Sequence, residues 1–106
     1  MKKEIKGWLD QLKDGKVPEP YFINIEYEEL GVVTSAIMEM GFSYVGMRMP
    51  HQKYRGRGRH LNSRSQYSDY DSPEGQDPKI RVTLSRIHSG GNQWRGRISA
   101  SEVKDV

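Results

Sequence analysis

Apolar residues recur at helical spacing in two segments of the N-terminal half. In the first segment they lie at i, i+3, i+4 and i+7, which predicts an amphipathic helix over residues 2–14 that Gly15 ends. In the second they predict a helix over residues 26–40, with glutamates at its N-terminus and Gly41 at its C-terminal cap. In chain order the apolar positions are Ile5, Trp8, Leu9, Leu12, Leu30, Val33, Ile37 and Met40. Because each helix has a single apolar stripe, both must pack against another element.

Alternating apolar and polar residues predict four strands. Residues 21–25 are aromatic and β-branched, residues 42–49 alternate imperfectly, and residues 80–85 alternate cleanly. Residues 94–100 also alternate, and the stretch "HSGGNQ" before them has the glycines and asparagine of a hairpin turn. The order is helix, strand, helix, strand, long loop and β-hairpin. We therefore expect one small α+β domain over residues 1–106, in which a mixed or antiparallel four-stranded sheet carries two helices on one face.

The connection over residues 50–78 is poor in apolar residues. Only four of its 29 positions are hydrophobic, whereas the other 77 positions hold 32 hydrophobic residues. A segment of this composition buries too little surface to offset the entropy lost on ordering. We therefore expect a long flexible loop, rich first in arginine and glycine and then in acids. A loop of this length in a compact domain is usually functional or disordered.

Charge is distributed unevenly along the chain, although the net charge is only +3. Residues 1–50 sum to −2 and residues 51–68 to +5, whereas residues 69–77 sum to −4 and residues 78–106 to +4. Eight of the nine arginines follow residue 50. Because the planar guanidinium suits phosphate and carboxylate oxygens, the C-terminal half is the favoured binding region.

Arg81, Arg95 and Arg97 alternate with apolar residues in the last two predicted strands. If the apolar residues face the helices, these arginines lie on the opposite face of the sheet. The hydroxyl-bearing residues of the same phase are Thr83, Ser85 and Ser99. An exposed face with cationic and hydroxyl groups predicts contact with a polyanion.

Trp94 lies beside these arginines in the sequence and allows two interpretations. Its phase is that of Ile98, which favours packing in the core. The alternative is a stacking contact with a nucleic-acid base. The arginines keep the opposite phase in either case.

The stretch "KYRGRGRHLNSRSQ" has five cationic side chains and no acid. The cationic residues are Lys53, Arg55, Arg57, Arg59 and Arg64. Its glycines let backbone N–H groups approach phosphates, and Tyr54 could stack on a base. We interpret the stretch as a phosphate clamp, and in composition it resembles RG-type segments that bind RNA. The alternative is a solvated loop that the following acidic stretch partly neutralises.

No motif identifies an enzyme, a metal site or a cofactor site. The residues available for acid–base catalysis are His51, His60, His88, Asp69, Asp71 and Glu74. The histidines are scattered, without metal-ligand or catalytic spacing, and the glycines form neither a phosphate loop nor a dinucleotide fingerprint. We therefore favour a binding protein without a cofactor over an enzyme.

The absence of cysteine from the sequence fits a reducing cytosol. No signal peptide or apolar run of membrane-spanning length is present, so we expect no membrane contact. The acidic side chains of the N-terminal half fit a solvated helix face, or else a surface for a protein partner. They are Glu26, Glu28, Glu29 and Glu39.

These observations predict a small cytosolic protein that binds RNA or single-stranded DNA through its arginine-rich sheet face and loop. Duplex DNA is less favoured, because neither predicted helix is basic. One alternative is a protein that sequesters a nucleotide or cyclic nucleotide, with arginines contributed by two subunits of a homo-oligomer. Another is an inhibitor of a nucleic-acid-handling protein, of the kind that phages and mobile elements encode.

Overall fold

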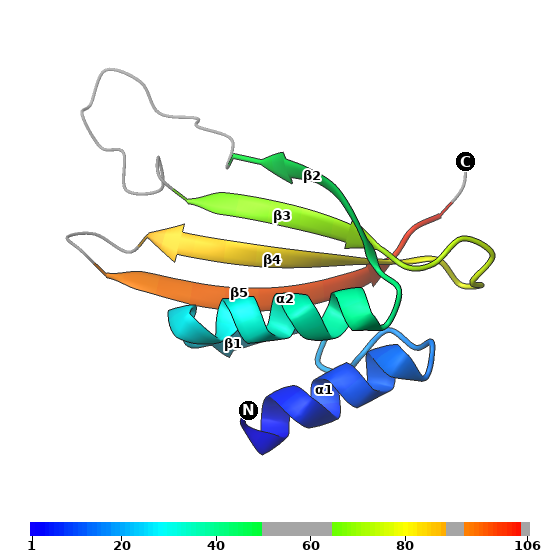
Figure 1. Ribbon diagram of the computed structural model, residues 1–106, viewed down its shortest axis with the longest axis horizontal. Helices are drawn as coiled ribbons and strands as arrows, with labels where there is room; N and C mark the ends of the chain where they lie inside the picture. The colour runs from blue at the N-terminus through cyan, green and yellow to red at the C-terminus, as the bar shows by residue number, and fades with distance from the viewer. Residues whose placement is uncertain (50–64, 89–92, 105–106) are drawn as a thin grey trace.

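The computed structural model describes residues 1–49, 65–88 and 93–104. Its elements, in chain order, are α1 (Lys3–Lys13), β1 (Phe22–Ile25), the 3-10 helix η1 (Tyr27–Glu29), α2 (Leu30–Glu39), β2 (Ser43–Arg48), β3 (Gln66–Asp71), β4 (Ile80–His88) and β5 (Trp94–Glu102). The strands form one antiparallel sheet in the order β1-β5-β4-β3-β2 (Figure 1). The α+β class with two α-helices is therefore confirmed. The prediction of four strands was wrong, because the described residues form five.

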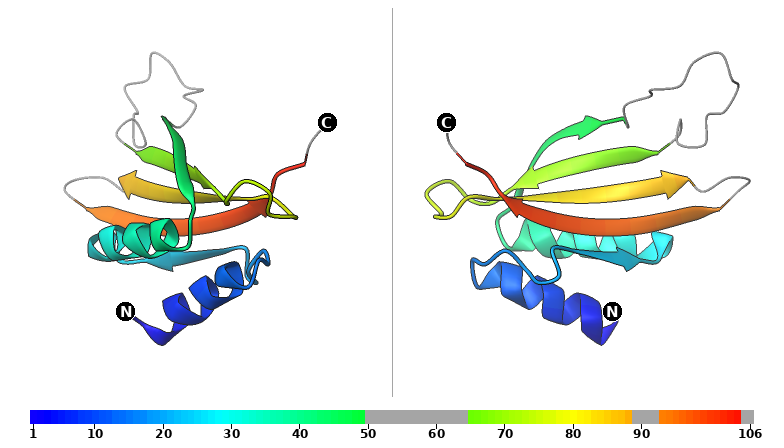
Figure 2. Two further views of the ribbon diagram at one scale, coloured as in Figure 1. Left: turned by 45° about the vertical axis from the view of Figure 1, so that its right-hand side comes forward. Right: turned by 180° about the vertical axis from the view of Figure 1, so that it is seen from behind.

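Both α-helices bury their apolar stripes in one core, on one face of the sheet. The fully buried members of this core include Ile5, Leu12, Val33, Ile37, Ile80, Val82 and Ile98. In Figure 2 the helices lie near β1 and β5, and β2 lies at the far end of the sheet. Among the described residues no helix covers the opposite face of the sheet. We call it the open face; its residues alternate along the strands with the core residues.

Glycines end both helices, as the sequence predicts. Gly15 follows α1 with φ +82°, and Gly41 follows α2 with φ +97°. These left-handed conformations are accessible to glycine without the steric cost that a Cβ atom brings. The segment predicted as one helix over residues 26–40 begins instead with η1. A capping box opens it, in which the Glu29 carboxylate accepts the Glu26 backbone N–H at 3.0 Å.

The expectation of one long loop over residues 50–78 was wrong for β3, which lies between β2 and β4. Its sequence, QYSDYD, is too polar to suggest a strand. The structure stabilises it by pairing its polar groups with residues distant in the sequence. Asp69, for example, accepts hydrogen bonds from Arg48 and from Thr83, each at 2.7 Å. The remaining residues of the predicted loop that precede Ser65 lie outside the described part of the chain.

Candidate functional site

The open face carries the three arginines predicted for it. On β4, Arg81 alternates with the buried Ile80 and Val82. On β5, Arg95 and Arg97 alternate with buried Gly96, Ile98 and Ala100. The face also carries the hydroxyl-bearing residues Thr83, Ser85 and Ser99. The predicted arrangement of these side chains is thus confirmed, and their contact with a ligand stays a prediction.

Two of the open-face arginines form bidentate ion pairs with carboxylates of β3. Arg48 donates from Nε and Nη2 to the carboxylate of Asp69, at 2.7 and 3.0 Å. Arg81 donates in the same way to Asp71, again at 2.7 and 3.0 Å, and Lys79 approaches Asp71 at 3.7 Å. Two acids of the stretch expected to neutralise the basic loop therefore pair with cations at the sheet instead.

These contacts fix the protonation state of both carboxylates. The hydrogen bond from Arg48 lowers the pKa of Asp69 below its ordinary value, and the hydroxyl of Thr83 adds to this effect. The hydrogen bond from Arg81 lowers the pKa of Asp71. Both groups are thus anionic at neutral pH, so neither suits the role of a general acid.

Two aromatic rings of the open face lie beneath guanidinium groups. The Arg97 guanidinium lies 4.7 Å from the centre of the Phe22 ring, and its Nε donates to Asn24 Oδ1 at 3.0 Å. The Arg48 guanidinium lies 5.3 Å from the centre of the Tyr67 ring. Because each guanidinium lies over a face of its ring, a base can stack on the guanidinium plane or take its place on the ring, and the cation can contact the phosphate.

The site residues predicted from the sequence do not include Phe22, Arg48 or Tyr67. The sequence does contain a signal for Phe22. This residue alternates with the buried residues of β1, which places its side chain on the open face. Arg48 ends a strand whose alternation is irregular, and the structure has a register shift in β2 between Tyr44 and Gly46. Tyr67 has no such signal, because the polar residues around it predict a loop.

The open face has a net positive charge. Its cationic side chains, together with the neighbouring Lys79, are Arg48, Lys79, Arg81, Arg95 and Arg97. The face also has two carboxylates, those of Asp69 and Asp71, so its net charge is +3. Within the described residues no carboxylate lies at ion-pair distance from Arg95 or Arg97. These two arginines therefore supply the charge best placed to meet an anion.

Trp94 lies on the helix-covered face, opposite to Arg95 and Arg97. Its ring is half-buried and contacts the rings of His88 at 4.7 Å and Tyr27 at 5.7 Å between centres. This position supports the packing interpretation. The alternative of a stacking residue that shares a ligand with the open-face arginines does not fit it.

The acid–base combinations considered from the sequence are only partly within the described residues. His88 is buried on the helix-covered face, whereas Asp69 and Asp71 lie on the open face. The structure therefore does not bring His88 together with either carboxylate. His51 and His60 lie outside the described residues.

The predicted clamp also lies outside the described residues. Its members are Lys53, Tyr54, Arg55, Arg57, Arg59 and Arg64. In the sequence they fall between β2 and β3, which are neighbours at one end of the sheet. Their role stays a prediction.

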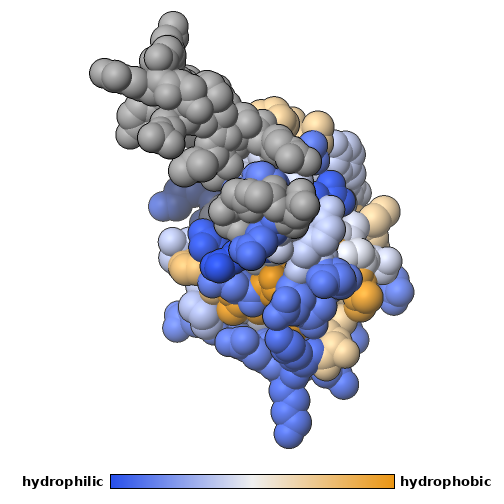
Figure 3. Space-filling view, turned by 90° about the vertical axis from the view of Figure 1, so that its left-hand side faces the viewer, coloured by the Kyte–Doolittle hydropathy of each residue, from blue (hydrophilic) through white to orange (hydrophobic). Residues whose placement is uncertain are grey.

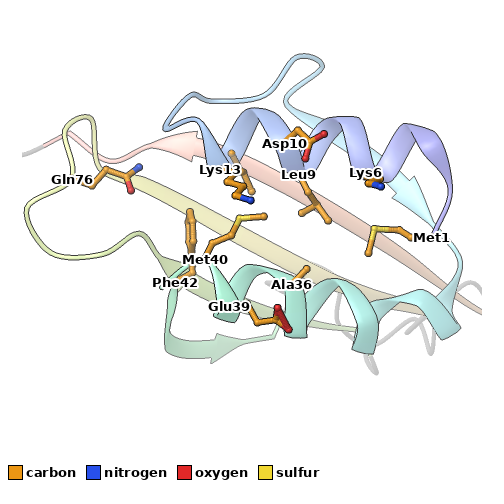
Figure 4. Close-up of a pocket in the computed structure, with 11 residues that line it drawn as sticks. Met1, Lys6, Leu9, Asp10, Lys13, Ala36, Glu39, Met40, Phe42 and Gln76 are labelled. Atoms are coloured by element: carbon orange, nitrogen blue, oxygen red, sulfur yellow. The ribbon is translucent and has the colours of Figure 1, made fainter.

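A groove lies between α1 and α2, on the helix-covered side of the sheet (Figure 4). Leu9, Met40 and Phe42 supply its apolar lining. Its charged residues are Lys6, Asp10, Lys13 and Glu39. Since these two cations and two acids cancel, the groove has no preference for an anion. The open face is therefore the stronger candidate for binding a polyanion.

Comparison with known proteins gives no relative from which to transfer a function. No protein-family model, curated protein or solved structure matches this chain. Within residues 1–49, 65–88 and 93–104, no helix is long and apolar enough to cross a membrane. The same residues bring together no group of three or more histidines and carboxylates that could hold a metal ion.

Proposed function

We propose that the open face binds single-stranded nucleic acid, either RNA or single-stranded DNA. The observation that carries this proposal is the combination of a net charge of +3 with two aromatic rings on one face of the sheet, which no described helix covers. Proteins that bind single strands commonly combine a cationic surface, which attracts the backbone, with rings on which bases stack.

The spacing of the two rings suits a strand that runs across the sheet. Phe22 is on β1 and Tyr67 is on β3, with β5 and β4 between them. At about 4.8 Å per strand, the two strands are separated by roughly 14 Å, and the register places Tyr67 two residues further along the sheet than the position opposite Phe22. Bases could stack on both rings while Arg97 and its neighbours contact the intervening phosphates. The half-buried hydroxyl of Ser99 on β5 would then lie beneath the sugars and base edges. In contrast, Thr83 donates its hydroxyl to Asp69, and Ser85 is buried.

Duplex DNA fits this surface less well than a single strand. A major groove is most often read by a basic helix, whereas α2 has no basic residue and α1 has both lysines and acids. The bases of a duplex are also stacked on one another and could not reach the rings. The basic residues between β2 and β3 in the sequence would extend the same electrostatic attraction.

Paired substitutions of arginine test the proposal. We expect Arg95→Ala with Arg97→Ala to weaken binding of a labelled single-stranded RNA about tenfold or more, because two phosphate contacts are lost. The readout is fluorescence anisotropy at low salt, with circular dichroism to verify folding.

The matched control is Arg86→Ala. Arg86 is on β4 like Arg81, but it has the phase of the core residues and so lies on the other face of the sheet, where it is exposed. We expect this variant to bind almost as the unmodified protein does. If it loses as much affinity as an open-face arginine variant, binding depends on overall charge and the open face is not the site. Equal competition by a mononucleotide would favour the small-ligand alternative.

A further inference from the structure

The edge strand β2 exposes an apolar surface that the binding proposal does not use. It pairs only with β3, so its other side has no strand in the described structure. Tyr44, Val45 and Met47 on β2, and Met49 directly after it, are each more than half exposed. Figure 3 shows hydrophobic surface at the top of the view, at the level that β2 occupies in Figure 1. An exposed apolar sheet edge commonly pairs with another strand.

The apolar surface continues onto α2. Thr34 faces β3, since it lines a small hollow with Ser68 and Tyr70. Met38 is one helical turn further along the same side of α2, and it is also more than half exposed. The helix-covered side of β2 and this side of α2 therefore form one apolar shelf at the end of the sheet.

The charge that could protect this edge is held elsewhere. Sheet edges are commonly blocked by charged side chains that discourage pairing. The only charged residue of β2 is Arg48, and its guanidinium is bound to Asp69 on the open face. Two copies of β2 can therefore approach without strong repulsion between like charges.

We propose that β2 pairs in antiparallel orientation with β2 of a second copy of this chain. An antiparallel pair of identical strands is related by a two-fold axis, so every contact is made twice. The unpaired backbone groups of each edge would be satisfied, and the apolar shelves of the two subunits would lie side by side and contact each other along the paired edge. Antiparallel pairing also separates the two Met49 ends, after which each sequence becomes strongly basic.

A second copy of β2 suits this edge, because the shelf and the strand that would pair beside it are both mostly apolar. Tyr44 and Met47 are large side chains without charge, and the flexible methionine can adapt to the surface that it meets. Each subunit would bury one short strand and the shelf beside it. A contact through one strand of six residues is small beside a standard interface, which buries roughly 800 Å² per partner, so we expect a weak, concentration-dependent dimer. The two sheets would join into one, with both open faces on the same side.

Sedimentation of the full chain without nucleic acid tests the dimer, so its result is independent of the binding proposal. We expect a shift from monomer to dimer as the concentration rises from roughly 1 µM to 1 mM. Met47→Lys should prevent the shift, because it places two like charges at the paired edge. Val32→Lys is the matched control, since Val32 is equally exposed on α2 but outside the shelf. It should dimerise normally.

Crosslinking gives a second test that does not depend on disrupting the strand. The chain has no cysteine, so Met47→Cys and Val32→Cys each introduce a unique thiol. With a short bis-maleimide, the dimer predicts a crosslinked band for Met47→Cys and none for Val32→Cys. A chain that stays monomeric at the highest concentration would overturn the proposal. So would a dimer that Met47→Lys leaves unchanged, or one that only Val32→Cys crosslinks.

Discussion

Replacing Asp71 by asparagine should weaken the fold slightly and strengthen nucleic-acid binding. The Asp71 carboxylate holds the Arg81 guanidinium by two hydrogen bonds, at 2.7 and 3.0 Å, and lies 3.7 Å from Lys79. Asparagine keeps the size of the side chain but removes its charge. Both cations would then be available to a phosphate, so stability and affinity should change in opposite directions.

The expected magnitudes follow from the exposure of the pair. The Asp71 side chain is 14% exposed, but that of Arg81 is 39% exposed, so solvent screens much of their attraction. We therefore expect a loss of about 1 kcal/mol, or roughly 4–5 °C in Tm for a domain of this size. A similar free energy on the binding side gives about 2- to 10-fold tighter binding at low salt. One further phosphate contact should make the slope of log affinity against log salt concentration steeper by roughly 0.7–0.9.

Thermal unfolding and anisotropy of a labelled single-stranded RNA measure the two effects on the same samples. Glu39→Gln is the control, because it also removes one negative charge but does so from α2, on the helix-covered side. It should change affinity by less than Asp71→Asn does, and its salt slope should stay the same. Equal affinities for the two variants, or weaker binding by Asp71→Asn, would refute the assignment of Arg81 to the binding face.

Two further predictions concern stability. The pKa values of Asp69 and Asp71 are lowered in the folded protein, so their stabilising contribution is complete above the unfolded value of about 3.9 and is lost as the pH falls through the folded values. Urea unfolding at pH 7 and below pH 4 should show this loss, and Asp69→Asn should reduce the difference; an unchanged difference would contradict it. Gly41→Ala should destabilise the fold by roughly 1–2 kcal/mol, because φ is +97° and the new Cβ would lie 2.9 Å from Pro73 Cγ. In contrast, a Cβ atom added at Gly31 on α2 would have no atom outside its own helix within 4 Å, so Gly31→Ala should stabilise the helix by about 0.5–1 kcal/mol. Unfolding curves in which Gly41→Ala is the more stable variant would be inconsistent with the structure.

The elements that the sequence predicted are those that local chemistry determines. The alternation in β4 and β5, the apolar stripes of the helices, and the φ requirement at Gly15 and Gly41 all arise from residues close in the chain. Each of these features could be recognised without knowledge of the fold.

The strand β3 could not be recognised in this way, because its stability depends on distant partners. Asp69 is tolerated in the sheet only because Arg48 and Thr83 hydrogen-bond to it, from strands 21 and 14 residues away in the sequence. The candidate site was incomplete for the same reason. Arg81 and Arg97 were placed by their phase, whereas the ring of Tyr67 became part of the site only once β3 was in the sheet.

The most direct test of the binding proposal is the salt dependence of affinity for a single-stranded RNA. With about four to six phosphate contacts, we expect affinity to fall roughly 10²-fold between about 50 and 200 mM salt, by release of counterions. The slope of log affinity against log salt concentration should become shallower when Arg95 and Arg97 are replaced. It should stay unchanged when Arg86 is replaced. Absence of binding at low salt, or an affinity that salt does not change, would contradict the assignment of the open face as a nucleic-acid surface.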